Sequence, residues 1–574
     1  MDRFRAAPLP LLLVALVPIA CGDDGGDGGD ASATATAGSS TAAATESSGA
    51  ASTSDAGSGS GASSSGGTTG GVDDGFEPLY GTPNVDDDDK NGKADWGEAV
   101  FAADDDIFDF TLPAWYLALL APGDRVDIAI AGELDHVRLW RGDQVALGHT
   151  GDAPALSLTL TAAEAGEPLQ VEFGDFLRRA TLTIRRLGAG GDELRVDEVT
   201  LLSAPMLVNH HVQDAEYAWA VQAPSNTSML NTMKEVMGDR FFIVKNDDVW
   251  IQDELEWATA TAPGERLNIA IDSIRDRPLD AFVKGLKGPD IQPMTWGIPG
   301  TQTTEDKFGN LEVTPPHSAG GVDYPFGRIY YGKGATCGPN DILTDHLDRQ
   351  KVQRPLQINT CWLCVGHVDE FISFIPDPSS PKGFKFLIAD VPAAYALLDA
   401  LPGATKIPRY AQTHGYATIG ALVGDDALRA QNQDIQSDFI DPVREQIKAE
   451  LDLDESDIIR LPGLFETVNG CSYKQKGVAA LIPGMLNLVV ANFAGEPLRI
   501  FVSDPFMRPD GAAQQDDPLI ANFEAALPPE YEIHFVDDWY TYHVAIGEVH
   551  CGTNVARKPD RDWWSTALHL IDAP

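Results

Sequence analysis

The sequence is poor in positive charge. It has 41 lysines and arginines against 86 aspartates and glutamates, which gives a formal net charge of -45 at pH 7 over 574 residues. A chain this acidic is a poor ligand for nucleic acid and for anionic membranes, because both repel it. The excess of acid suits cationic partners, calcium or simple solubility, and charge alone leaves these alternatives open. With 43% hydrophobic residues, the chain has enough apolar content for two to four domains with their own cores.

Cysteine is also scarce. The chain contains six: Cys21, Cys337, Cys361, Cys364, Cys471 and Cys551. Six cysteines in a chain of this length do not make a disulfide framework, even in an exported protein. Cys361 and Cys364 form a CxxC pair without a second such pair, which is weak support for zinc. A local disulfide or two packed thiols is the preferred interpretation.

Long apolar runs are absent except at the N-terminus. There, Arg3 and Arg5 precede "PLPLLLVALVPIA", an apolar run too short to cross a membrane as a helix. Cys21 follows Ala20 as in a bacterial lipoprotein processing site, although Pro18 stands where such sites usually carry leucine. We expect residues 1–21 to be a signal peptide with a lipidation cysteine, and the protein to be exported, either anchored in a bacterial cell envelope or secreted. A plain cleavable signal is the alternative.

Residues 22–75 consist mainly of Gly, Ser, Ala, Thr and Asp and show no apolar periodicity. Such a segment cannot bury enough apolar surface to fold. We therefore expect a disordered linker that tethers the folded part to the N-terminus.

Short runs of alternating polar and apolar residues fill residues 76–203. They read "RVDIAIAG", "HVRLWRG", "LSLTLTA", "LQVEFG" and "ATLTIRRL". This spacing of strands and turns predicts an all-β, immunoglobulin-like sandwich. The segment contains no nucleophile beside a base, so we expect it to support or position another domain.

An acidic loop begins this β domain. Oxygen-bearing side chains stand at its positions 1, 3, 5 and 9: Asp87, Asp89, Asn91 and Asp95. Gly92 stands at position 6 and Glu98 at position 12, which is the spacing by which a short loop wraps calcium. The pattern favours a calcium site over a solvated acidic loop, which remains the alternative.

Strand-like and helix-like runs alternate from residue 204 to 574. Residues 437–451 carry apolar side chains at helical spacing, whereas "DIIRLP", "AALIPGMLNLVVAN", "LRIFVSD" and "YEIHFVDD" read as strands. "PLIANFEAAL" reads as a helix. We expect an α/β domain of repeated strand–helix units. No glycine-rich phosphate loop follows any strand, which disfavours nucleotide chemistry.

Three segments of this domain concentrate polar residues among apolar ones: "VWIQDELEWA", "VGHVDEF" and "GEVHCGTN". Taken singly, each is a charged strand edge or loop. Taken together, they supply Cys551 as a nucleophile and a histidine to lower the pKa of its thiol. Asp253 and Asp369 would suit a guanidinium group, because its donors form a rigid fork that carboxylates accept. The combination predicts a guanidine substrate rather than a protease.

The same residues carry a resemblance to a known family. "VWIQDELE", "GNLEVTPP", "GRIYYG", "VGHVDEFISFIPD" and "YTYHVAIGEVHCGTNVARKP…WW" resemble the catalytic domain of the protein-arginine deiminases, in the family's order, over residues 249–564. Residues 76–203 are similar to that family's middle, calcium-binding domain. The family's additional N-terminal domain is replaced here by the signal and linker.

The resemblance implies a five-bladed α/β propeller of ββαβ units with a central acidic pocket. It implies calcium-dependent hydrolysis of peptidyl-arginine to peptidyl-citrulline through a thioether on Cys551. His367 would be the general acid and base, and Asp253 and Asp369 would bind the guanidinium. Arg277 would bind the substrate backbone, and Trp250 would flank the aliphatic part of the substrate arginine.

The resemblance also implies Ca²⁺ ligands, all of them hard oxygen donors. One site would use Gln252, Glu256, Glu312 and the carbonyl groups of Phe308 and Leu311. A second would use Glu254, Asp272, Ser273 and Asp276. Asp290 would join the sites of the middle domain.

One departure from the family concerns the substrate. Ala545 stands where some members place an arginine over the bound peptide, which puts peptide affinity and sequence preference in question. Two other functions remain open. One is a deiminase or amidinotransferase for free arginine or agmatine, and the other is a non-catalytic calcium-binding surface protein.

Overall fold

The computed structural model describes residues 75–88, 90–96, 98, 106–151, 153–469, 471, 477–559 and 561–573. The predicted signal peptide with Cys21, the predicted linker up to residue 74, and Asp89 of the acidic loop lie outside these residues. In the part of the chain that is described, no helix is both long enough and apolar enough to cross a membrane.

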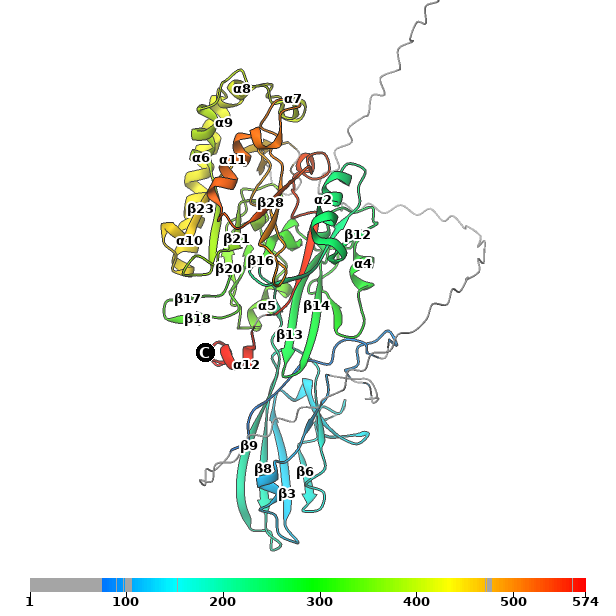
Figure 1. Cartoon of the computed structure of the whole chain (residues 1–574). Coiled ribbons are helices and arrows are strands. Elements are labelled where there is room, and N and C mark those ends of the chain that lie inside the picture. Colours follow the sequence, from blue (N-terminus) through cyan, green and yellow to red (C-terminus); the bar gives the residue numbers. More distant parts are fainter. Residues whose placement is uncertain are drawn as a thin grey trace, which may run out of the picture. The chain divides into compact units, whose positions relative to one another are not determined.

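Two sheets form the N-terminal part of the described chain (Figure 1). One has the order β1 (Leu79–Gly81), β9 (Glu193–Ser203), β8 (Arg179–Leu187), β3 (Arg125–Gly132) and β6 (Ser157–Thr161). The other has the order β2 (Phe108–Phe110), β7 (Leu169–Phe173), β4 (Val137–Arg141) and β5 (Gln144–Gly148). Strand β3 alternates, so that Val126, Ile128 and Ile130 are buried, and they share one apolar core with Leu139 and Val171 of the second sheet. The strands predicted from alternation are confirmed.

Five sheets of a common pattern make up the remainder, as far as the structure is described. In each, a middle strand pairs antiparallel with one neighbour and parallel with the other. The first sheet consists of β29 (Thr553–Arg557), β11 (Ala215–Val221) and β12 (Phe241–Val244). The second consists of β13 (Leu255–Ala262), β14 (Glu265–Asp272) and β15 (Ile291–Met294), and β10 (Leu207–Val208) extends it beside β13. The others are β16 (Leu311–Val313), β19 (Ile329–Gly332), β20 (Leu356–Ile358); β21 (Ile372–Pro376), β22 (Phe384–Asp390), β23 (Ile458–Pro462); and β26 (Val489–Val490), β27 (Arg499–Ser503), β28 (Glu532–Val536).

Helices connect the parallel strands of each sheet, because such a pair needs a crossover of a dozen or more residues. The crossovers are α2 (Thr227–Met237), α4 (Asp280–Lys284), α5 (Asp341–Arg349) and α11 (Pro518–Ala526). The fourth sheet has a longer one, of α6 (Val391–Asp399), α7 (Pro408–Thr413), α8 (Ile419–Val423), α9 (Asp426–Ile435) and α10 (Asp441–Leu451). The repeated strand–helix pattern is therefore confirmed as a mixed α/β fold. Short elements complete the chain: α1 (Ala114–Leu117), α12 (Trp563–Thr566), α13 (Leu568–Ile571), and the hairpins β17 (His317–Ala319) with β18 (Val322–Tyr324) and β24 (Phe465–Val468) with β25 (Gly477–Ala480).

The last strand of the chain joins the first of the five sheets. Strand β29 pairs antiparallel with β11, so that Val555 lies opposite Ala218. The two ends of this α/β domain are thereby joined through main-chain hydrogen bonds. As a result, the residues that precede β29 lie beside elements formed some 300 residues earlier.

Residues 251–254 form a single helical turn, α3 (Ile251–Glu254), before β13 begins. One local prediction is wrong. Most of "AALIPGMLNLVVAN" is irregular, with strands only at its two ends. The helix predicted over residues 437–451 is present as α10, with a π-helical turn, Gln436–Ile440, in front of it.

The prediction for the CxxC pair is also wrong. Cys361 bonds to Cys337 and Cys364 bonds to Cys471, so the two cysteines of the pair belong to different disulfides. Both bridges have Cα atoms 5.6 Å apart. The Cys364–Cys471 bridge spans 107 residues and includes the long crossover of α6 to α10, whereas Cys337–Cys361 spans 24. The pair is thus structural and does not bind zinc.

Loss of the longer bridge is expected to cost more stability than loss of the shorter one. The Cys364→Ala/Cys471→Ala protein should lose about 2–4 kcal/mol of unfolding free energy, because a bridge restricts the unfolded chain more when its loop is longer. The Cys337→Ala/Cys361→Ala protein should lose about 1 kcal/mol less, from the logarithmic dependence on loop length. Denaturant unfolding of both proteins measures the difference, and equal losses would contradict it.

Candidate active site

The candidate catalytic residues and Asn487 lie in segments that lead into four of the five repeated sheets. We call these the entry segments. Asp253 is on α3 before β13, His367 and Asp369 are at the 3-10 turn before β21, and Cys551 is in the turn before β29. Asn487 precedes β26 in the same way. A repeated fold therefore places residues from four distant parts of the chain around one point.

Cys551 is buried and lies outside both disulfides. Its Sγ accepts a hydrogen bond from Asn487 Nδ2 at 3.3 Å and lies 3.8 Å from Asp369 Oδ2. Asn487 Oδ1 also accepts the main-chain N–H groups of His550, at 3.0 Å, and Cys551, at 3.2 Å. Asn487 thus fixes the cysteine turn from both ends of its amide, a role that sequence reasoning missed because no motif surrounds it.

Asp369 has a second partner on the cysteine turn. Its Oδ2 accepts hydrogen bonds from Asn487 Nδ2, at 2.6 Å, and from His550 Nδ1, at 2.8 Å. Its Oδ1 is buried and accepts no hydrogen bond from the described residues. The turn that carries Asp369 is fixed by Glu370, whose carboxylate accepts the N–H groups of Gly366 and His367. One oxygen of this aspartate is therefore held by the protein, and the other is left for a donor from a ligand.

His367 faces the other aspartate. Its ring is completely buried, its Nε2 donates to the carbonyl of Thr304 at 2.9 Å, and its Nδ1 lies 3.9 Å from Asp253 Oδ1. Since a carbonyl can only accept, Nδ1 carries the lone pair in the neutral ring and can take up a proton. A Cβ at Gly309 would stand 2.6 Å from this Nδ1 and 3.0 Å from Asp369 Oδ2. Only glycine leaves room for the two side chains to meet a common ligand.

Arg275 shows how a guanidinium group is already bound in this region. It is 1% exposed, and its Nη1 lies 3.3 Å from Asp253 Oδ2 while its Nε lies 3.2 Å from Glu254 Oε2. Asp248 contacts it too, and Asp248 Oδ2 also lies 3.1 Å from Arg277 Nε. Arg277 is thus placed at the edge of the site, with 23% of its side chain exposed.

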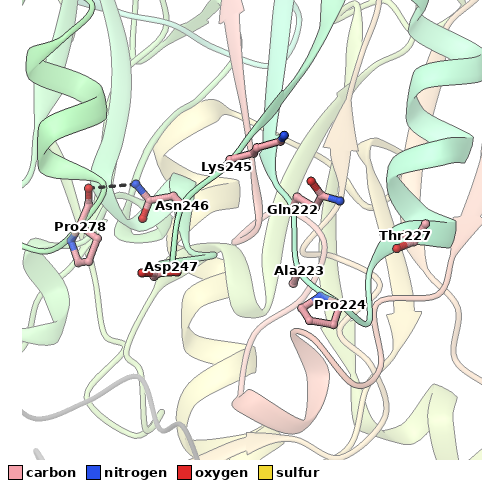
Figure 2. A pocket seen from close by; sticks show the side chains of 8 residues that line it. All are labelled: Gln222, Ala223, Pro224, Thr227, Lys245, Asn246, Asp247 and Pro278. Carbon is pink, nitrogen blue, oxygen red and sulfur yellow. Dashed lines mark hydrogen bonds between the residues drawn. The ribbon is translucent and has the colours of Figure 1, made fainter. Parts of the chain in front are cut away.

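Two hollows differ in what they can hold. A cavity of about 20 Å³ beside Cys551 is lined by Asn487, Gly547 and Glu548 among others. Trp250 is buried next to it, since a Cβ on Gly547 would lie 2.4 Å from the indole and 3.3 Å from Cys551 Sγ. A larger, open hollow of about 630 Å³ contains none of the candidate catalytic residues (Figure 2). It includes Pro278, which follows Arg277, so it adjoins the edge of the site.

The first predicted set of metal ligands is brought together. Gln252 Nε2 donates to Glu256 Oε2 at 2.6 Å and to the Phe308 carbonyl at 3.2 Å. Gln252, Glu256 and Glu312 line one cavity of about 20 Å³, and Leu311 precedes Glu312 on β16. Burial raises the pKa of Glu256 to about 8. Burial, with Glu256 and Asp369 nearby, raises the pKa of Glu312 well above its usual range.

The second set is brought together with one exchange. Carboxylate oxygens of Glu254, Asp272 and Asp280 lie within 4.8 Å of one another. Asp276 is exposed, at a positive φ of 44°, on the loop between Asp272 and Asp280. Asp280, at the start of α4, was not predicted, because the family resemblance implied no metal ligand at this position. Ser273 is buried beside the cluster. Its N–H donates to the carbonyl of Glu254, and its hydroxyl donates to the carbonyl of Asp306.

This second cluster fits a cation. Oε1 of Glu254 and Oδ1 of Asp272 are buried and accept no hydrogen bond from the described residues, while Oε2 of Glu254 lies 3.2 Å from Arg275 Nε. Burial raises the pKa of Glu254 to about 8 and that of Asp272 to about 6. Buried carboxylates are stable as charged groups only when paired or coordinated, and hard oxygen donors are the ligands that calcium prefers.

The acidic loop of the N-terminal part is closed on itself. Asp87 accepts the N–H groups of Asn91 and Gly92, Asp95 accepts that of Asp88, and Lys287 lies 3.4 Å from Asp87. The Asn91 amide donates to Glu98. The N–H of Asp290 donates to Asp86, at 3.0 Å, which connects this loop to the α/β domain. Asp86 and Asp106 are also buried. Neither was among the predicted ligands, because these were chosen only by their spacing within the loop.

A sequence model of the family described as "Protein-arginine deiminase (PAD)" matches residues 193–565. The chain is 34% identical over 430 residues to the protein-arginine deiminase type-4 of Mus musculus, covering 69% of this chain and 62% of that protein. It is 33% identical over 422 residues to the type-4 protein of Homo sapiens, covering 68% of this chain and 60% of that protein. It is 35% identical over 338 residues to the human type-1 protein, covering 56% and 48%. The chain thus aligns with less than two thirds of the length of these relatives.

Proposed function

The chain belongs to the protein-arginine deiminase family, and from this we propose that it hydrolyses arginine side chains in peptides to citrulline and ammonia. The observation that carries the proposal is the position of the Cys551 thiol, 3.8 Å from the buried Asp369. His367 and Asp369 both adjoin Gly309, and His367 Nδ1 lies 3.9 Å from Asp253. Citrulline formation from a blocked arginine peptide tests it.

The proposed chemistry begins with binding of the guanidinium. Asp253 and Asp369 approach from two entry segments. Asp369 offers its buried Oδ1 to the donors of a planar cation, and Asp253 offers its Oδ1, since its Oδ2 is already paired with Arg275 Nη1 at 3.3 Å. The Cys551 thiolate attacks the central carbon and forms a C–S bond. The C–N bond to one terminal nitrogen then breaks, and His367 Nδ1 delivers the proton with which ammonia leaves.

A water molecule completes the turnover. His367 Nδ1, now without its proton, takes one from the water, whose oxygen adds to the amidino carbon. The C–S bond breaks, the thiolate is restored, the remaining hydroxyl proton passes to solvent, and the carbon keeps the oxygen as the carbonyl of citrulline. The Asn487 amide, which donates to Cys551 Sγ at 3.3 Å, supports the thiolate in both steps.

The fold supports the same assignment at a finer level. We infer that the five repeated sheets, residues 204–574, are the blades of an α/β propeller, and that the pairing of β29 with β11 closes it. The entry segments then face a common axis, where the active site lies. We infer that the two N-terminal sheets, residues 76–203, form an immunoglobulin-like domain similar to the family's middle domain.

A peptide is the proposed substrate rather than free arginine. Arg277 lies at the edge of the site with 23% of its side chain exposed, and we expect it to bind a peptide carbonyl. The open hollow of about 630 Å³ that Pro278, the neighbour of Arg277, helps to line has room for flanking residues (Figure 2). Ala545 offers no such contact, so we expect binding along the peptide to depend mainly on Arg277. An enzyme for free arginine or agmatine would need neither feature.

We propose that Ca²⁺ binds at two places around Asp253. One ion would be held by Gln252, Glu256, Glu312 and the carbonyls of Phe308 and Leu311. The other would be held by Glu254, Asp272 and Asp280, with Ser273 beside them. When bound, calcium supplies positive charge that removes the repulsion between these buried carboxylates. Glu254 and Gln252 are the immediate neighbours of Asp253 on α3, so the position of the catalytic carboxylate depends on both sets.

Calcium removal is expected to abolish activity. Glu256→Gln and Glu312→Gln should each raise the calcium concentration needed for half-maximal activity by about 10-fold or more, because each removes one charged oxygen ligand. Exposed Glu445→Gln is the matched control and should leave that concentration unchanged. Citrulline formation is measured over a calcium titration. Full activity after exhaustive chelation would contradict the calcium requirement while leaving the deiminase chemistry in place.

We propose that the protein is exported, on the strength of the N-terminal apolar run followed by Cys21. Its partners would then be arginine-containing proteins or peptides outside the cytoplasm. The two disulfides support this location, because such bonds persist in oxidising compartments.

A further inference from the structure

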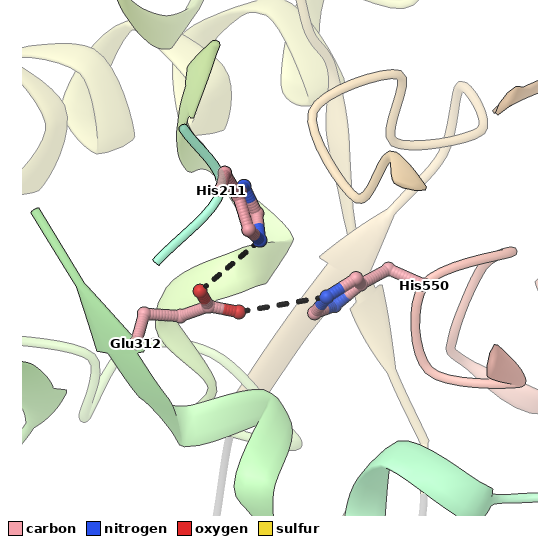
Figure 3. Close-up of side chains that lie close together, drawn as sticks. All are labelled: His211, Glu312 and His550. Carbon is pink, nitrogen blue, oxygen red and sulfur yellow. Dashed lines mark ion pairs between the residues drawn. The ribbon is translucent and has the colours of Figure 1, made fainter. Parts of the chain in front are cut away.

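Two histidines and a glutamate form a cluster next to the catalytic residues (Figure 3). His211 is in the loop between β10 and β11, Glu312 is on β16, and His550 is in the turn before Cys551. His211 Nε2 lies 3.4 Å from Glu312 Oε2, and His550 Nε2 lies 3.6 Å from Glu312 Oε1. Figure 3 shows both rings directing a nitrogen at the same carboxylate, one from each side.

The far nitrogen of each ring is fixed by another partner. His211 Nδ1 lies 3.2 Å from the carbonyl of Phe374, and His550 Nδ1 lies 2.8 Å from Asp369 Oδ2. A carbonyl or an ionised carboxylate can only accept, so both Nδ1 atoms are protonated and both Nε2 atoms present a lone pair when the rings are neutral. This is the outer hydrogen bonding by which proteins orient histidine ligands of a metal.

The separations fit a transition metal. Two ligand atoms, each about 2.0–2.1 Å from a tetrahedral Zn²⁺, stand roughly 3.3 Å apart, close to the two Nε2–Oε distances here. The three residues line a cavity of about 20 Å³ that Glu256 also lines. That volume is close to what one small ion or water needs. The Arg557 guanidinium borders the cavity but donates to main-chain carbonyls of Gln213 and Val490.

We propose that His211, Glu312 and His550 form a site for a divalent transition metal ion of the zinc type. Imidazole nitrogens favour such ions over calcium, which prefers oxygen alone. A set of two histidines and one glutamate, with a fourth position open to water or to Glu256, is a common tetrahedral zinc environment. The site itself does not depend on the proposed enzymatic function.

Its consequence for activity rests on the proposed function. Glu312 belongs both to this site and to the first calcium set. Zinc and calcium would therefore compete for the same carboxylate. His550 connects the zinc site to Asp369, which the reaction needs free on one oxygen. Zinc is therefore expected to inhibit deimination, and added calcium is expected to relieve the inhibition.

Direct metal binding tests the site without using activity. Zn²⁺ is titrated into the purified full-length protein by calorimetry, and Co²⁺ is added in a parallel sample for its absorption spectrum. The wild-type chain should bind zinc, and His211→Ala should weaken binding by more than about 100-fold, since even outer-shell partners of a ligand are worth about 10–100-fold. His569→Ala, an exposed histidine outside the cluster, is the matched control.

A second variant and a second signal distinguish loss of a metal ligand from loss of the fold. His211→Gln removes the imidazole but keeps a donor for the Phe374 carbonyl, and equal melting temperatures would show that the fold is intact. The Co²⁺ spectrum should indicate tetrahedral nitrogen and oxygen ligands and should be the same in Cys551→Ser. Unchanged zinc affinity in both His211 variants, or a cobalt spectrum with a sulfur band that Cys551→Ser removes, would overturn the proposal.

An activity assay distinguishes zinc binding from its expected effect on citrulline formation. In calcium, His211→Ala should retain activity and lose its sensitivity to zinc, because His211 has no place in the proposed chemistry. If zinc binds as described and citrulline formation is unaffected in the wild type, the shared use of Glu312 is wrong but the metal site stands. If the protein forms no citrulline under any condition, the proposed function fails and the binding result is untouched.

Discussion

Cys551→Ser is expected to reduce citrulline formation by about 10⁴-fold or more, which is the scale on which removal of an enzyme's nucleophile acts. Serine has nearly the same shape, so the hydrogen bond from Asn487 Nδ2 and the packing of the turn should persist. Its hydroxyl is a far weaker nucleophile, because it is not ionised near neutral pH, whereas a thiol beside a base can be. Steady-state assays on a blocked arginine peptide, with calcium, measure the loss.

Substrate binding separates the chemical role from a structural one. The Cys551→Ser protein should bind the peptide nearly as well as the wild-type protein, as measured by calorimetry, and should show a similar melting temperature. Turnover above a few per cent of the wild-type rate would contradict the assignment of Cys551 as the nucleophile.

Asp253→Asn and Asp369→Asn are each expected to lower kcat/KM by on the order of a thousandfold. Each change leaves a side chain of the same shape but removes one partner of a buried charge pair, which commonly costs about 3–5 kcal/mol. Asp369→Asn keeps an oxygen for the Asn487 amide but no longer balances a substrate cation at 3.8 Å from the thiol. The assay is the same, with peptide concentrations spanning the KM.

Asp341→Asn provides the matched control for both variants. Its side chain is 89% exposed at the start of α5, so the same chemical change there should leave kcat/KM unaltered. If Asp253→Asn or Asp369→Asn kept about a tenth of the wild-type efficiency, that aspartate would not bind the guanidinium.

Periodic segments of the fold were predictable from the sequence. The alternation in residues 125–132 and the helical spacing of Val443, Ile447 and Leu451 each gave the observed element. These patterns are strong because one face of each element is buried in the core and the other is not. Residues 251–254 show no such contrast between faces. All four are buried, so their pattern does not distinguish a helical turn from a strand.

The catalytic residues were predictable because they occur in short motifs. Asp253, His367, Asp369 and Cys551 stand in three short segments that concentrate polar residues among apolar ones. The structure brings Asp253 beside His367, Cys551 beside Asp369, and both pairs together at Gly309, although Asp253 and Cys551 are separated by 298 residues. Closure of the domain by β29 on β11 is a long-range feature that no local window contains.

Residues whose role depends on tertiary contacts were not predictable. Asn487 stands in an irregular segment and acquires its role only through the cysteine turn. Asp280 replaces the predicted Asp276 because the first turn of α4, and not the preceding loop, faces Glu254 and Asp272. The disulfide partners Cys337 and Cys471 lie 24 and 107 residues from their bonded cysteines, and spacing alone does not choose between such pairings.

The most direct test of the central claim compares a blocked arginine peptide with free arginine as substrates of the full-length protein. Citrulline is measured for each with saturating calcium and again after chelation. We expect citrulline from the peptide in calcium, little from free arginine, and none from either substrate in chelator. Efficient turnover of free arginine with little turnover of the peptide would contradict peptidyl-arginine deimination, and no citrulline from any substrate in calcium would contradict an enzymatic function for this chain.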